Sequence, residues 1–71
     1  MNQQFSVDYF IDNFQMYIEQ NEHDHTPIDA MNRYYRSVVS TLLLDHLTKN
    51  AEIVKRLRNL DAAYEHVKQT L

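Results

Sequence analysis

The absence of glycine constrains this chain more than any other feature of its sequence. Among 71 residues there is no glycine and only one proline, Pro27. Tight hairpin turns need positive φ angles, which glycine adopts without steric cost. A sheet of several strands would need several such turns. The composition therefore predicts an all-α fold, and the length limits it to a single domain over residues 1–71.

Cysteine is absent as well, so no disulfide can stabilise the small core. A chain of this length usually needs a disulfide, a metal or a partner subunit. The lack of cysteine suits a reducing cytoplasm. The opening MNQQFSVDYF has neither a basic start nor an apolar run, and the run Leu42-Leu43-Leu44 is far too short to cross a bilayer. We therefore expect a cytoplasmic protein without a membrane segment.

A first amphipathic helix is predicted at about residues 7–21. Ser6 is a suitable N-cap, and Asp8 falls in the first turn, where the helix dipole favours negative charge. Apolar residues then recur at spacings of three and four, at Val7, Phe10, Ile11, Phe14, Tyr17 and Ile18. The roughly opposite face is either ordinary surface or a second contact surface, and it carries Phe5, Tyr9 and Met16.

A second helix is predicted to begin at Pro27. Thr26 can cap it, proline is favoured at the first helical position, and Asp29 resembles the acidic member of a capping box. This arrangement of residues is typical of a helix start.

The second helix is predicted to be long, ending at about residue 70. Residues 28–71 contain neither glycine nor proline. At about 100° per residue, the apolar residues of 28–42 and of 53–71 fall on the same side. The alternative is a break at residues 48–50, with Asn50 capping a third helix.

Helix length then bears on assembly. The short helix would extend about 22 Å and the long one about 66 Å, so the first covers only about a third of the second. Each large apolar side chain left in water forfeits about 1.5–3 kcal/mol. We therefore expect a helical hairpin that forms an antiparallel dimer with four-helix-bundle character, whereas a three-helix fold could remain monomeric. The predicted dimer interface consists of Leu43, His46, Leu47, Asn50, Val54, Leu57, Leu60, Tyr64 and Val67.

His46 interrupts the apolar stripe of the long helix. It is predicted either to be partly open to solvent or to form a polar layer that fixes the register of the dimer.

Two stretches of the chain resemble a known family. These are FSVDYFIDNF (5–14) and residues 30–68, which include YYRSVVSTL and LTKNA. They are similar to the YvfG-like family of small proteins from Bacillus and its relatives. The resemblance implies a self-associating α-helical hairpin and supplies no catalytic residues.

The stretch NEHDHTPIDA (21–30) holds the candidate metal ligands His23, His25 and Asp24. Metal sites need several donors converging on the ion. A His-x-His pair points both rings the same way only in an extended strand, whereas this segment leads into a helix cap. The stretch is therefore predicted to be the solvated corner of the hairpin, and no metal or other cofactor is expected.

Enzymatic activity is not expected. Neither Ser37 nor Ser40 has a histidine one helical turn away, and no glycine-rich turn offers an oxyanion hole.

Charge bears on the choice of partner. Residues 1–32 hold six acids and no lysine or arginine, whereas residues 33–71 hold four acids and seven bases. This split favours the two segments lying against each other and argues against a general nucleic-acid binder. The leading interpretation is a non-enzymatic adaptor or regulator that self-associates and binds an unknown protein partner. The alternatives are a metal-binding or metal-sensing module using His23 and His25, and a weak nucleic-acid binder using Lys55, Arg56 and Arg58.

Overall fold

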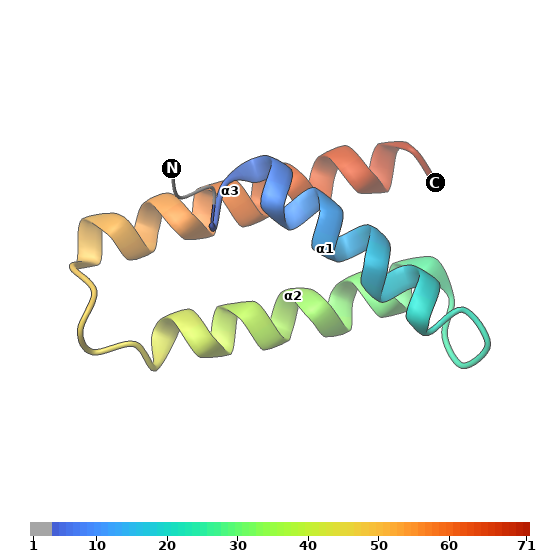
Figure 1. The fold of residues 1–71 in the computed structure, drawn as a ribbon, viewed down its shortest axis with the longest axis horizontal. Coiled ribbons are helices and arrows are strands. Elements are labelled where there is room, and N and C mark those ends of the chain that lie inside the picture. Colours follow the sequence, from blue (N-terminus) through green and yellow to red (C-terminus); the bar gives the residue numbers. More distant parts are fainter. Residues whose placement is uncertain (1–3) are drawn as a thin grey trace.

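A computed structural model describes residues 4–71 and contains three helices in that range. They are α1 (Val7–Gln20), α2 (Pro27–Leu43) and α3 (Asn50–Gln69), and the described residues form no strand. Helices α2 and α3 run antiparallel, and α1 lies obliquely across them (Figure 1). The all-α prediction is confirmed. Within residues 4–71, no helix combines the length and the apolar character needed to span a membrane.

The first two helices begin as their capping residues predict. The Ser6 hydroxyl accepts a hydrogen bond from the Tyr9 N–H at 3.1 Å, and α1 follows. The Thr26 hydroxyl accepts from the Asp29 N–H at 3.2 Å, with Pro27 as the first residue of α2. Both hydroxyls satisfy N–H groups that have no partner within their own helix.

The predicted long helix is wrong. Helix α2 ends at Leu43, and residues 44–49 form a turn before α3. The Asp45 carboxylate organises this turn, because Oδ1 accepts from the N–H groups of Leu47 (2.9 Å) and Thr48 (3.0 Å), while Oδ2 accepts from the Thr48 hydroxyl (2.6 Å). An Asp side chain that bonds nearby backbone groups competes with helix continuation.

The alternative with a third helix is confirmed in the number of helices, but it expected the break at residues 48–50, whereas the break spans residues 44–49, and it misassigned the cap. Asn50 is the first residue of α3, and the N-cap is Lys49, which makes no side-chain capping bond.

The core lies where the three helices meet. Its fully buried members are Phe10, Phe14, Met31, Leu60, Ala63 and Val67. Helix α1 packs more extensively against α3 than against α2. The Phe14 ring makes edge-on contacts with Tyr34 of α2 and Tyr64 of α3, at centroid distances of 4.9 and 5.8 Å. Because α3 folds back, Leu60 and Val67 of the apolar stripe are buried within one chain, whereas Val54 and Leu71 remain exposed.

Candidate interaction surface

Four large apolar side chains are exposed at one end of the molecule. We call them the apolar end: Leu43 (66% exposed), Leu44 (69%), Leu47 (98%) and Val54 (46%). They come from the last residue of α2, the turn, and the second turn of α3, a region over which α1 does not extend (Figure 1). Exposed apolar side chains of this size make this end the candidate interaction surface.

The predicted dimer-interface residues are divided between this end and the core. Leu43, Leu47 and Val54 belong to the apolar end, and His46 and Asn50 are exposed beside them. Leu57 and Tyr64 are half-buried. Leu60 and Val67 are 0% and 1% exposed, so the folded single chain already covers them.

One arginine ties the turn to the rest of the fold. The side chain of Arg56 is 20% exposed, and its Nη1 lies 3.9 Å from Asp45 Oδ2. Its Nε is buried 3.4 Å from Glu52 Oε2, an ion pair that does not reach hydrogen-bond geometry. The guanidinium also lies 4.3 Å from the centre of the Phe5 ring, within cation–π distance. Arg56 therefore joins the turn, α3 and the segment before α1.

The inward orientation of Arg56 divides the basic patch proposed for nucleic-acid binding. Lys55 and Arg58 are exposed, whereas Arg56 is engaged with Asp45, Glu52 and Phe5. Only two of the three cations point outward together.

Hydrogen bonds hold the pKa of Asp45 below its ordinary value. The Thr48 hydroxyl makes the largest contribution, followed by the N–H groups of Leu47 and Thr48 and the charge of Arg56. These groups favour the ionised carboxylate, which is the form that closes the turn.

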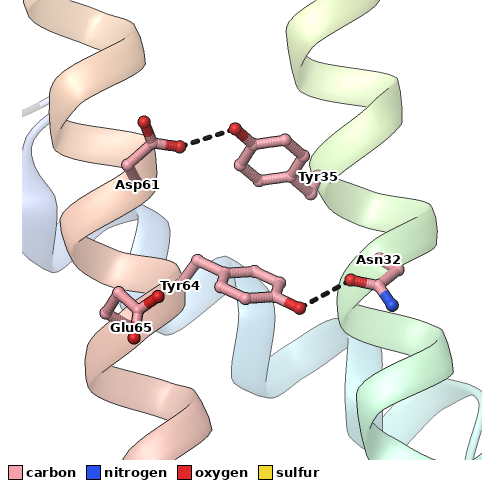
Figure 2. Close-up of a pocket in the computed structure, with 5 residues that line it drawn as sticks. All are labelled: Asn32, Tyr35, Asp61, Tyr64 and Glu65. Atoms are coloured by element: carbon pink, nitrogen blue, oxygen red, sulfur yellow. Dashed lines mark hydrogen bonds between the residues drawn. The ribbon is translucent and has the colours of Figure 1, made fainter.

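Helices α2 and α3 are bridged by two tyrosine hydroxyls. Tyr35 donates to Asp61 Oδ1 at 2.6 Å, and Tyr64 donates to Asn32 Oδ1 at 2.7 Å (Figure 2). The two rings meet edge-on at 5.5 Å. With Glu65 these residues line an open cleft of about 440 Å³. The hydrogen bond to Asp61 and partial burial raise the pKa of Tyr35 above its usual range.

The sequence analysis placed Tyr64 in the predicted dimer interface but did not predict these bridges. Asn32 and Asp61 each lie three residues before a tyrosine along their own helix. That spacing puts the polar residues beside the stripe, but it does not reveal the antiparallel pairing across the two helices.

The candidate metal ligands are not brought together. His25 Nδ1 lies 2.8 Å from Asp29 Oδ2, and Arg33 approaches the same carboxylate at 3.5 Å. The side chain of His23 is 93% exposed and lies 3.8 Å from Glu22. In the part of the chain that the structure describes, no three histidine or acidic side chains are grouped to hold a metal ion.

Comparison with known proteins identifies relatives over nearly the whole chain. The family model described as YvfG protein matches residues 3–70. A protein of Bacillus subtilis (strain 168), described as "Uncharacterized protein YvfG", is 55% identical over 69 residues. The alignment covers 97% of this chain and 94% of that relative.

Proposed function

This chain belongs to the YvfG family, and we propose that it acts as a small non-enzymatic helical protein of the cytoplasm that works through self-association and protein–protein contact. The apolar end is the observation that carries this proposal. Leu47 is 98% exposed and its three apolar neighbours are 46–69% exposed. Covering one such side chain gains about 1.5–3 kcal/mol, so a partner that covers all four binds favourably.

A second copy of the chain is the first partner that this surface fits. Lys55 and Arg58 are exposed close to Val54 on α3. Three exposed acids lie on α1 at spacings of four and seven residues, which places them on one side of that helix: Asp8, Asp12 and Glu19. A two-fold axis can set the basic region of each copy near the acidic helix of the other.

The proposed assembly is an antiparallel dimer. Each copy contributes the ends of α2 and α3 to the contact, so four helices meet there. This arrangement has the four-helix-bundle character that the sequence suggests, and it closes without leaving the apolar end free for further copies.

The test is the mass in solution of the wild type and of Leu47→Ser, measured by light scattering with size exclusion. Leu47 is almost fully exposed in the single chain, so serine leaves the monomer fold intact. Each dimer contains two such residues, so we expect the dissociation constant to rise by at least about 100-fold. Leu71→Ser is the matched control, because Leu71 is 60% exposed at the other end of the molecule.

Two results would refute the dimer. One is a wild-type mass equal to the 8.5 kDa of a single chain at micromolar concentration. The other is a dimer that Leu47→Ser and Leu71→Ser affect equally.

A protein partner beyond the second copy is part of the proposal. Capture of the tagged protein from a native-host lysate, followed by mass spectrometry, tests it, with Leu47→Ser as the comparison. A partner recovered with the wild type and lost with Leu47→Ser supports an adaptor role. Recovery of the protein alone limits the function to self-association.

A further inference from the structure

The turn between α2 and α3 contains no residue that prevents it from being helical. It reads LDHLTK (44–49), without glycine or proline. Leu44 already has right-handed helical angles (φ −86°, ψ −6°), and Lys49 is extended (φ −63°, ψ 146°). Among the described residues only Phe5 has a positive φ, and it lies outside the turn. Rotations within allowed regions would therefore straighten residues 44–49.

One side chain holds the turn closed. All three side-chain hydrogen bonds within it end on the Asp45 carboxylate, which also pairs with Arg56. Loss of these contacts leaves the segment free to continue the helix of α2 into α3.

The buried residues of α2 and α3 are in phase for one continuous helix. At about 100° per residue through the turn, Met31, Leu42, Leu60 and Val67 fall within an arc of about 20°. All four are buried, at 0–3% exposure. A straightened chain would therefore present a single apolar stripe from α2 through α3.

The tyrosine bridges fix where a symmetry axis would lie. In the pair Tyr35–Asp61 and in the pair Asn32–Tyr64, the midpoint of the two residue numbers is 48. If α3 of a second copy made these same contacts with α2, the two-fold axis would cross each chain at Thr48. That position lies inside the turn that must straighten.

From these observations we propose that the dimer forms by exchange of α3 between two copies, with residues 44–49 as the hinge. This inference rests on the self-association proposed above. Each α1 packs on its own α2 and on the α3 of the second copy, so the core contacts of the single chain are preserved. The new contacts lie only around the hinge.

The register of the bridges also pairs the residues next to the hinge. The midpoint of 48 sets Leu42 opposite Val54 and Leu43 opposite Ile53, two pairs that lie within one chain in the compact fold and between chains after exchange. It also sets His46 opposite the partner's Asn50, which forms a polar layer near the axis.

Isotope-filtered NMR separates exchange from simple docking. Labelled and unlabelled chains are unfolded together in urea and refolded as mixed dimers. The contact between the rings of Phe14 and Tyr64, whose centroids lie 5.8 Å apart, is then recorded between chains. Exchange predicts strong interchain signals for this pair. A dimer that shows interchain signals at Leu47 but none between Phe14 and Tyr64 overturns the exchange and leaves the proposed dimer intact. A monomer overturns both.

A matched pair of hinge variants gives an independent test. The N–H of His46 makes none of the described hydrogen bonds of the turn. His46→Pro therefore removes no described hydrogen bond of the compact single chain, but it breaks a helix that continues through the hinge. We expect its dimer association constant to fall by more than about 100-fold relative to His46→Ala. Circular dichroism of His46→Pro checks that the variant keeps the helical content of His46→Ala. Equal association by the two variants would contradict the exchange.

Discussion

The Phe14 ring is the point at which all three helices meet, so a conservative change there measures how much that junction contributes. Phe14 is 0% exposed and contacts Tyr34 and Tyr64 edge-on. Leucine keeps most of the buried apolar area but loses both ring contacts, each of which contributes about 0.5–1.5 kcal/mol beyond area burial. We expect Phe14→Leu to lower the free energy of unfolding by about 2 kcal/mol. This is a large share of the about 4–11 kcal/mol typical of a chain of this length.

Urea unfolding followed by far-UV circular dichroism measures this loss. A change of about 2 kcal/mol corresponds to a fall in Tm of about 8–16 °C for a domain of this size. All samples are compared at one protein concentration, because dimer formation couples to unfolding. Met16→Leu is the control on the same helix, since Met16 is 53% exposed and its change should remain within about 0.5 kcal/mol. If Phe14→Leu is no more destabilising than Met16→Leu, the three-helix junction described here is wrong.

Three further predictions concern charge and metal binding. Hydrogen bonds from Thr48 and the backbone hold the pKa of Asp45 below its ordinary 3.8. The ionised carboxylate therefore stabilises the turn above pH 3.8, and this stabilisation is lost as the pH falls through the lower pKa of the folded state. Asp45→Asn should remove this transition when the amide shifts of the turn are followed against pH. The hydrogen bond to Asp61 raises the pKa of Tyr35 above 10.0. The contribution of this hydrogen bond to stability is therefore present below pH 10.0 and is lost as the pH rises through the pKa of the folded state. Asp61→Asn should move the pKa of Tyr35, measured by NMR of the ring carbons, towards 10.0. Zinc should give equal calorimetric heats with the wild type and with a variant carrying both His23→Ala and His25→Ala, and a heat specific to the wild type would revive the metal-binding alternative.

The parts of the fold that depend on local chemistry could be predicted from the sequence. Ser6 and Thr26 accept from N–H groups three residues ahead, an interaction that spacing alone reveals. The apolar periodicity placed Phe10 and Phe14 on the inner face of α1, where both are fully buried.

The apolar periodicity could not predict that the helix ends after α2, because the apolar residues before and after the break fall on the same side of one continuous helix. The deciding contacts come from Asp45, whose carboxylate closes the turn without glycine or proline. This error also affected the assignment of burial. Leu60 and Val67 were expected to need a second chain, whereas the returning α3 covers them within one chain. Long-range pairing, rather than local propensity, made the difference.

The preference of α1 for α3 has a consequence during synthesis. Leu60 follows Phe14 by 46 residues. At about 5–20 residues per second, the ribosome needs on the order of several seconds to supply the packing partner of a helix it has already made. Helix α1 has 14 residues and is only marginally stable alone. We expect its phenylalanines to remain accessible to chaperones in that interval. Neighbouring ribosomes on one message would then hold several such helices close together, each waiting for an α3 that the adjacent nascent chain can also provide.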